Sequence, residues 1–172
     1  MRQLCYKAAI HPERQCAWRC FQSPDPKALS LEDTIEIAHA KGVPVLVDAA
    51  GQIYPLDLFG SYVRKGADFQ CTAAKYMSSP QSTGLAFGST DMIRKLALQS
   101  FVSYEGRRIR GVGRPQKVDR QEMVGVVAAV RLWMTMNHEE RLADTETKCR
   151  NMMAPLQGIS GVTVELSDNI IG

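Results

Sequence analysis

Two charged residues, Asp48 and Lys75, stand where two predicted strands end. Asp48 follows the apolar run VPVLV at 43–47, and Lys75 follows the segment ADFQCTAA at 67–74. We expect both strands in a parallel sheet, and ligands of such sheets bind at the carboxyl ends of the strands. A lysine amine can bond covalently to a carbonyl compound, and the hydroxyl and glycine residues that follow at 76–84 suit a phosphate.

The position of Asp48 points to the same chemistry. A carboxylate beside the protonated nitrogen of a pyridine ring keeps that ring an electron sink. One cofactor, pyridoxal 5'-phosphate, therefore explains both Asp48 and Lys75. Less specific interpretations stay open, because a single lysine is usually a solvated surface charge and Asp48 could cap a helix that begins in the next residues. Cys71 lies beside this site in sequence and is interpreted as a small buried thiol, not as a nucleophile.

The elements that must position these residues follow from hydrophobic spacing and from helix start and stop signals. Ser30 with Asp33 resembles a capping box, and Leu31, Ile35 and Ala38 share one face of the helix that follows and stops at Gly42. Strands are expected at 43–47, 69–72 and 84–88. Further helices are expected at 56–66, at 90–99 with Thr90 as its cap, and from Arg120 to about residue 143, with Met123, Val127, Val130 and Met134 packed in the core. The alternation of strands and helices predicts an α/β protein with a mostly parallel sheet.

Composition and charge exclude several classes of function. The chain has 172 residues, of which 45% are hydrophobic and 23% charged, and its formal net charge is only +3. This charge is too small to indicate a nucleic-acid-binding protein, and the dense basic residues between 107 and 120 indicate an anionic ligand instead. His11, His39 and His138 lack the spacing of metal ligands, so no metal is expected.

Cellular context is also predicted from composition. Five cysteines (Cys5, Cys16, Cys20, Cys71 and Cys149) include no CxxC spacing, which fits a reduced cytoplasm. No apolar run approaches the roughly 20 residues of a membrane span, and the N-terminus lacks the apolar core of a signal peptide. We therefore expect a cytoplasmic protein without a membrane partner.

Three segments carry a resemblance to a known family: LSLEDTIEIAHAKGVPVLVDAAGQ at 29–52, GADFQCTAAKYMSSPQSTGLAFG at 66–88 and GRPQKVDRQEMVGVVAAV at 113–130. They resemble the selenocysteine synthase-like family of fold type I pyridoxal-phosphate enzymes. This family includes L-seryl-tRNA selenium transferases and relatives that resemble D-glucosaminate-6-phosphate ammonia-lyase. The resemblance extends over roughly residues 21–166 and implies a homo-oligomer built from dimers, with active sites at the subunit boundary.

The resemblance also implies roles for individual residues. Lys75 would be the lysine that forms the Schiff base and Asp48 the partner of the pyridinium nitrogen. Thr72 would contact the phosphate in place of the usual serine, with Gln52, Ser82 and Thr83 nearby. Arg114 and Lys117 fall on an R-x-x-R pair that resembles an anion site for the substrate; the lysine replaces the second arginine and weakens bidentate recognition.

Two classes of function follow from these roles. The first is an enzyme that acts on a small amino substrate with an anionic group, by α,β-elimination or β-replacement; a seryl-tRNA selenium transferase activity is a further alternative, so tRNA stays open as a substrate. The second is a non-catalytic chain that retains the lysine motif.

The same resemblance predicts the organisation of the chain. Residues 1–21 are an unassigned N-terminal segment, 22–118 the C-terminal part of a cofactor-binding large domain, and 119–172 a linking helix with the start of a small domain, including a strand GVTVEL at 161–166. Family members carry a long N-terminal half that has no counterpart here. We therefore expect the C-terminal part of a longer protein, inactive without the remainder.

Overall fold

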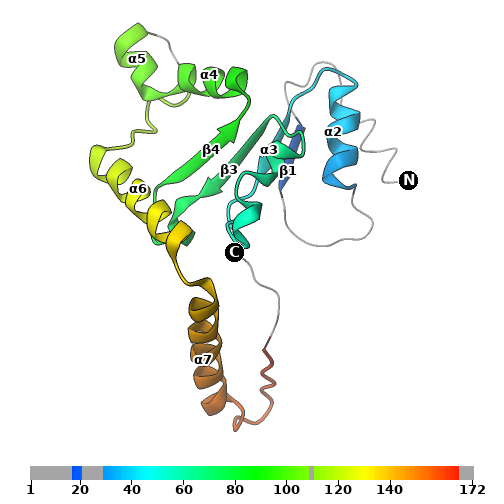
Figure 1. Ribbon diagram of the computed structural model, residues 1–172, viewed down its shortest axis with the longest axis vertical. Helices are drawn as coiled ribbons and strands as arrows, with labels where there is room; N and C mark the ends of the chain where they lie inside the picture. The colour runs from blue at the N-terminus through cyan, green and yellow to red at the C-terminus, as the bar shows by residue number, and fades with distance from the viewer. Residues whose placement is uncertain (1–16, 21–28, 109–110, 167–172) are drawn as a thin grey trace.

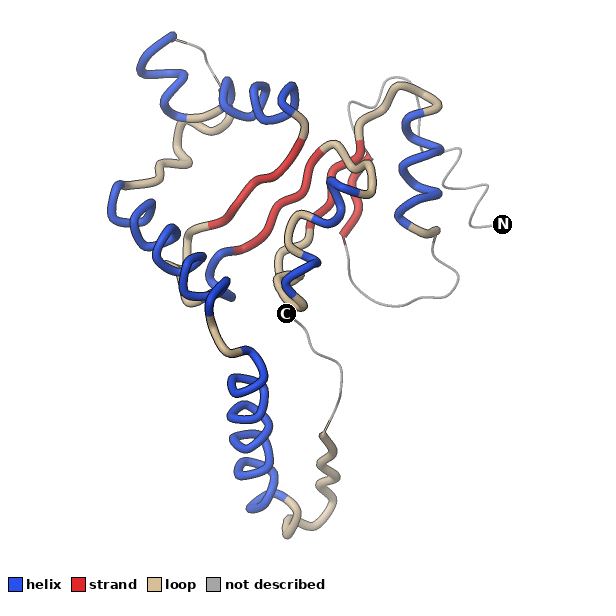
Figure 2. Tube along the Cα trace, in the orientation of Figure 1, coloured by secondary structure: helices blue, strands red, loops and turns tan. Residues whose placement is uncertain are grey.

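A four-stranded sheet forms the centre of the fold. The computed structural model describes residues 17–20, 29–108 and 111–166. The strands lie in the order β1 (Ala17–Cys20), β2 (Val45–Asp48), β3 (Phe69–Ala73) and β4 (Gly84–Gly88). The pairs β1–β2 and β2–β3 are parallel and β3–β4 is antiparallel (Figures 1 and 2). The predicted α/β class is therefore confirmed, and β1 is a strand that hydrophobic patterning did not predict.

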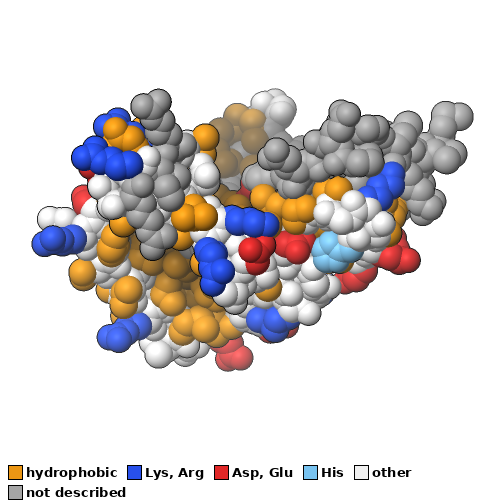
Figure 3. Space-filling model, turned by 90° about the horizontal axis from the view of Figure 1, so that it is seen from above, with side chains coloured by type: hydrophobic (Ala, Val, Ile, Leu, Met, Phe, Trp, Pro, Cys, Tyr) orange, Lys and Arg blue, Asp and Glu red, His pale blue; other side chains and the backbone are white. Residues whose placement is uncertain are grey.

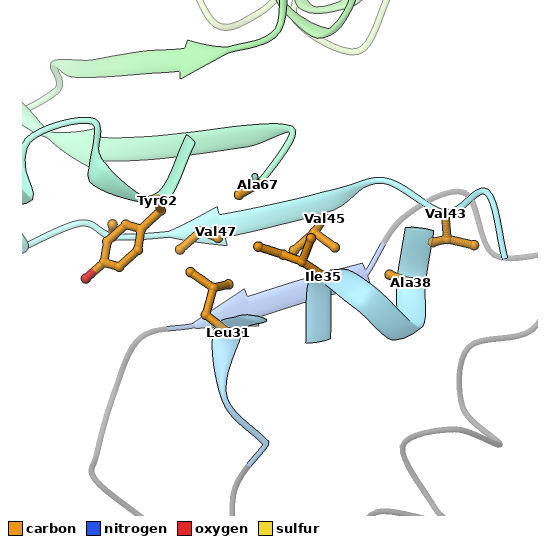
Figure 4. Packing of buried hydrophobic residues seen from close by; sticks show 9 residues of the cluster. Leu31, Ile35, Ala38, Val43, Val45, Val47, Tyr62 and Ala67 are labelled. Carbon is orange, nitrogen blue, oxygen red and sulfur yellow. The ribbon is translucent and has the colours of Figure 1, made fainter. Parts of the chain in front are cut away.

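Helix α2 (Leu31–His39) covers β2, as its spacing predicted. The Ser30 side chain caps the helix by accepting a hydrogen bond from the Asp33 backbone N–H at 2.9 Å. Leu31, Ile35 and Ala38 are buried and belong to the same core cluster as Val45 and Val47 of β2 (Figure 4). Burial of each large aliphatic side chain stabilises the fold by roughly 1.5–3 kcal/mol.

The segment 56–66 is not the single helix that was expected. It forms a short 3-10 helix, η1 (Leu56–Leu58), and one turn of α-helix, α3 (Ser61–Arg64). Gly60 separates them with φ 72°, a left-handed conformation that interrupts a right-handed helix. Tyr62 is the buried residue of α3, whereas Val63 is only half-buried.

Helix α4 spans Thr90–Gln99, and its N-cap lies one residue earlier than predicted. Its cap is Ser89, whose side chain accepts from the Met92 backbone N–H at 3.2 Å, while Thr90 is already helical. The reason is local, because Ser89 has the extended backbone that lets a hydroxyl reach the N–H three residues ahead. Helix α5 (Phe101–Arg107) follows directly.

The expected long helix from Arg120 is two helices, α6 (Arg120–Thr135) and α7 (His138–Leu156). Helix α6 ends at its C-cap, Met136, and the next residue, Asn137, caps α7, because its side chain accepts from the Glu140 backbone N–H at 3.3 Å. A cap competes with helix continuation at the same residue. Helix α7 projects away from the sheet (Figure 1).

The apolar stripe of α6 was assigned to the wrong side of that helix. Met123, Val127 and Met134 are 51%, 54% and 47% exposed, and among the four stripe residues Val130 is the one that packs against a core cluster. Trp133 is the large buried side chain of α6. The helix carries apolar residues on more than one side, so its spacing could not indicate which side meets the sheet.

The predicted strand at 161–166 is absent. Residues 162–166 belong to neither a helix nor a strand, since a strand exists only where a partner supplies its backbone hydrogen bonds. The predicted domain boundaries stay predictions. No helix in the described ranges combines the length and apolar character that a membrane crossing requires.

A second core cluster joins segments that are distant in sequence. It contains Ile53, Ala74, Met77 and Trp133, all at least 96% buried. The indole N–H of Trp133 donates to the backbone carbonyl of Ile53 at 3.1 Å, in a buried setting. Helix α6 is thereby attached to the loop that follows β2.

We expect Trp133→Phe to lower the free energy of unfolding by roughly 1–3 kcal/mol, because it retains an aromatic ring but leaves the buried Ile53 carbonyl without its donor. Urea unfolding measures this change. Leu132→Ala is the control, because Leu132 is 66% exposed on the same helix. An equal loss of stability in both variants would contradict the role of the hydrogen bond.

Candidate functional site

The parallel pairing of β2 and β3 brings Asp48 and the segment with Lys75 to one edge of the sheet. Asp48 is the last residue of β2 and lies opposite Cys71 of β3. The pairing continues past the strand end, since the Ala73 N–H donates to the Ala50 carbonyl at 3.0 Å. Strand β3 leads directly into a 3-10 helix, η2 (Ala74–Met77), which contains Lys75. Both strands thus end at the place where a ligand of an α/β sheet is expected.

Asp48 and Cys71 lie on the same face of the sheet. The Cys71 thiol donates to Asp48 Oδ1 at 3.7 Å, and both residues are half-buried. Burial raises the pKa of the Cys71 thiol, and the nearby negative charge of Asp48 raises this pKa further. The thiol is therefore held in its protonated form at neutral pH, which makes it a hydrogen-bond donor and a poor nucleophile.

Lys75 is exposed on η2. Its Nζ lies 5.3 Å from the centroid of the Tyr76 ring, and within the described part of the chain its amine forms no ion pair. The turn that carries it is well anchored, because the Ala74 N–H donates to the Thr83 carbonyl at 3.0 Å. The Thr83 hydroxyl in turn donates to the Pro80 carbonyl at 2.6 Å. These bonds hold the lysine turn against the loop 79–83.

Thr72 and Gln52 occupy different environments. Thr72 is 2% exposed, and its hydroxyl has no hydrogen-bond partner among the described residues. Side chains alternate along a strand, so Thr72 lies on the face of β3 opposite Cys71. Gln52 is half-buried in the loop after Asp48, where its N–H donates to the Ala49 carbonyl at 3.1 Å.

Ser82 and Thr83, the two hydroxyl residues predicted to lie near the phosphate, are both engaged in hydrogen bonds. The Thr83 side chain is buried and hydrogen-bonded to Ser79 at 2.8 Å. The exposed Ser82 hydroxyl donates to the carboxylate of Glu122, a residue that sequence analysis did not select. Glu122 also accepts from the Asp119 N–H at 3.1 Å, as the second half of a capping box on α6. Its position three residues after the cap was the signal available in the sequence.

Arg114 and Lys117 are exposed and contact neither Asp48 nor Lys75. The Arg114 guanidinium lies over the Tyr104 ring at 4.3 Å, and the Lys117 backbone N–H donates to the Pro115 carbonyl at 3.0 Å. Of the other basic residues nearby, Arg110 and the side chain of Arg107 lie outside the described residues. The structure therefore associates Arg114 with α5, and within the described ranges neither Arg114 nor Lys117 forms an ion pair.

His138 packs against Tyr54, in the loop after Asp48, and bonds to α6. Its Nε2 donates to the Trp133 carbonyl at 2.8 Å and its Nδ1 accepts from Arg141 Nε at 3.1 Å, an assignment that follows from the hydrogen-bond partners. The imidazole packs between Tyr54 and Trp133, with centroid distances of 4.8 and 4.7 Å. Across the described ranges no group of three His, Cys, Asp or Glu residues could hold a metal. His11, Cys5 and Cys16 lie outside the described residues.

Comparison with known proteins finds no matching family model. The chain is 26% identical over 146 residues to a 5'-C-glycyluridine monooxygenase-decarboxylase of Streptomyces sp, covering 85% of this chain and 33% of the relative. It is 26% identical over 145 residues to a D-glucosaminate-6-phosphate ammonia lyase of Salmonella typhimurium (strain 14028s / SGSC 2262), covering 84% of this chain and 34% of the relative. The chain thus spans about a third of the length of the curated relatives it matches.

Solved structures show the same fold. A D-glucosaminate-6-phosphate ammonia-lyase matches with a TM-score of 0.62 and 24% identity, over 76% of this chain and 32% of that one. A cystathionine gamma-lyase from Lactobacillus plantarum, complexed with L-serine, matches with a TM-score of 0.53 and 15% identity, over 94% of this chain and 39% of that one. The chain therefore has the mixed α/β fold that these two lyases share, and it forms part of a fold type I domain.

Proposed function

We propose that this chain is part of a pyridoxal-phosphate-dependent enzyme in which Lys75 bonds covalently to the cofactor and Asp48 partners the ring nitrogen. The observation that carries the proposal is the shared sheet edge, where Asp48 ends β2 and Lys75 follows β3. Similarity to two proteins named as lyases supports the same class of chemistry.

Lys75 and Asp48 fit this cofactor, whereas the residues predicted to contact its phosphate fit it less well. Lys75 offers an exposed amine without an ion pair among the described residues. Among the described residues, Asp48 accepts one side-chain hydrogen bond, at Oδ1 from a neutral thiol, so Oδ2 has no partner there and suits a cationic ring nitrogen. The buried Thr72 hydroxyl has no hydrogen-bond partner among the described residues, but it lies on the sheet face opposite Cys71 and Asp48, so it fits a phosphate contact poorly. Ser82 fits less well, because the Glu122 carboxylate beside it repels an anion.

The reaction we propose depends on proton abstraction from the substrate. When bound, pyridoxal phosphate withdraws electrons from the substrate Cα. The substrate amine would first take the place of Lys75 on the cofactor; the released Lys75 amine would then accept the Cα proton at Nζ, and the group on Cβ would depart with the electrons of its bond. Asp48 keeps the ring nitrogen protonated throughout. Elimination or replacement at Cβ of an amino substrate follows from these roles.

The proposal also includes a class of substrate. We favour a small amino compound with an anionic group, which Arg114 and Lys117 would bind, and a lyase reaction as in the ammonia lyase relative. We place the chain with selenocysteine synthase-like enzymes on its quoted motifs, and we expect a homo-oligomer. Seryl-tRNA selenium transfer is the alternative reaction, and a chain that retains Lys75 and Asp48 without catalysis is the alternative class.

Lys75 is tested by trapping. Incubation with pyridoxal phosphate followed by borohydride should leave a pyridoxyl group on Lys75, and Lys75→Ala should abolish more than nine-tenths of the label, because Lys75 is the amine at the strand end. Peptide mass spectrometry locates the label. Lys95→Ala is the control, since Lys95 is an exposed lysine paired with Asp91. Absence of any adduct would support the non-catalytic alternative, and a label on another lysine would refute the assignment.

Asp48→Asn should weaken pyridoxal phosphate binding about tenfold or more, because loss of one charge-assisted hydrogen bond removes roughly 1.5–3 kcal/mol. A titration of the cofactor absorbance measures the affinity. The side chain keeps its shape, so unfolding should change little. Equal affinity for pyridoxal phosphate in Asp48→Asn and in the parent chain would show that Asp48 does not bind the ring nitrogen. Asp57→Asn is the matched control, since Asp57 is an exposed residue of η1.

Alanine at both Arg114 and Lys117 should weaken an anionic substrate about tenfold at low salt and leave cofactor affinity unchanged, because we assign these cations to the substrate. D-glucosaminate 6-phosphate is the probe, and its effect on the cofactor absorbance is the readout. The difference should shrink at high salt as charges are screened. A double substitution at exposed Arg94 and Lys95 controls for net charge. Unchanged probe affinity would eliminate this anion site.

A further inference from the structure

Gly125 lies where α6 approaches the loop that follows the lysine turn. A Cβ atom at this position would lie 2.9 Å from both Cγ and Cδ of Pro80. Carbon atoms do not approach this closely without a shift, and a proline ring cannot rotate away. Gly125 is in the interior of a 16-residue helix, where glycine is less favourable than alanine by roughly 0.5–1 kcal/mol. Gly125 therefore allows α6 to approach Pro80 closely, although it does not favour the helical conformation.

Pro80 is linked to Lys75 by a short series of hydrogen bonds. The Pro80 carbonyl accepts from the Thr83 backbone N–H at 3.1 Å and from the Thr83 hydroxyl at 2.6 Å. The Thr83 carbonyl accepts from the N–H of Ala74, the residue before Lys75, at 3.0 Å. A displacement of Pro80 can therefore reach the backbone of η2 at Ala74 through a single residue, Thr83.

The same helix also holds the segment that follows Asp48. Trp133 donates to the Ile53 carbonyl at 3.1 Å. Trp133 and Gly125 are eight residues apart, or about 12 Å along a helix that rises 1.5 Å per residue. One rigid element therefore contacts both halves of the candidate site, near the Lys75 turn at one end and near the Asp48 loop at the other.

We propose that Gly125 is a positioning residue, whose lack of a side chain seats α6 on Pro80 and thereby sets the place of the Lys75 amine relative to Asp48. This inference rests on the proposed cofactor site. Gly125 touches neither cofactor nor substrate. It acts through Pro80, Thr83 and the backbone of Ala74.

The test compares Gly125→Ala with Gly106→Ala. Gly106 is the matched control, because it also lies in a helix, α5, and a Cβ there would meet nothing within 4 Å. In Gly125→Ala we expect at least a tenfold loss of pyridoxal phosphate affinity with a shifted absorbance maximum of the bound cofactor, since small misplacements of reacting groups have large effects. Helicity by circular dichroism should not fall. Gly106→Ala should bind as the parent chain does.

A second substitution provides rescue. Pro80→Ala removes both atoms that the new Cβ would meet, so the double variant Gly125→Ala with Pro80→Ala should recover most of the lost affinity, a coupling that a double-mutant cycle measures. If Gly125→Ala does not fold, recovery of folding and cofactor binding in the double variant supports the contact. Full affinity in Gly125→Ala, or no recovery in the double variant, would overturn the inference.

Failure of the cofactor proposal has a different signature. If the parent chain forms no adduct with pyridoxal phosphate, the cofactor proposal fails, but hydrogen exchange at the Ala74 and Thr83 amides still tests the contact. These amides should exchange at least tenfold faster in Gly125→Ala than in Gly106→Ala, and the double variant should restore them. Equal exchange rates would show that Gly125 does not control the turn, with or without a cofactor.

Discussion

The parallel register of β2 and β3 is the constraint on which the candidate site depends. With Asp48 opposite Cys71, strands β2 and β3 end at the same edge of the sheet, and the backbone pairing continues from Ala49 and Ala50 to Cys71 and Ala73. A slip of one residue would move Asp48 to the face that packs against α2, because side chains alternate along a strand. The buried Val45 and Val47 prevent this slip, since the same movement would place them in solvent.

Helix α6 adds a second constraint that acts across the sheet edge. Its inner side contacts the Ile53 carbonyl through Trp133, the Ser82 hydroxyl through Glu122 and the Pro80 ring at Gly125. Trp133 acts as a hydrogen-bond donor, Glu122 acts as an acceptor, and Gly125 leaves room for the proline ring because it has no side chain. Together they attach the loop after β2 and the loop after the lysine turn to one element.

The outer side of α6 remains apolar and accessible. Val124 and Leu132 are 69% and 66% exposed, and with Met123, Val127, Ala128 and Arg131 they line a hollow of about 600 Å³. Figure 3 shows hydrophobic side chains gathered on the face seen from above. Exposed apolar area of this kind is typical of surfaces that other protein segments cover, and the chain spans about a third of the relatives it matches.

Local signals in the sequence determined much of the fold. The Ser30 cap, the β-branched run that ends at Asp48 and the strand at 84–88 were all predicted correctly, because each depends on neighbouring residues alone. Lys75 and Asp48 could be selected for the same reason, since each follows an apolar strand within a few residues. Their placement at one sheet edge then followed from the rules of parallel sheets.

Tertiary structure alone decided the rest. Which side of α6 is buried depends on what it packs against, so Met123 and Val127 were assigned to the core while Trp133 occupies it. The contacts of Glu122 with Ser82 and of Gly125 with Pro80 span about forty residues, and no local pattern encodes such pairs. The sequence by itself thus determined which residues could do chemistry and which strand ends carry them. Packing determined which helix holds them, because spacing specifies a face of a helix but not its partner.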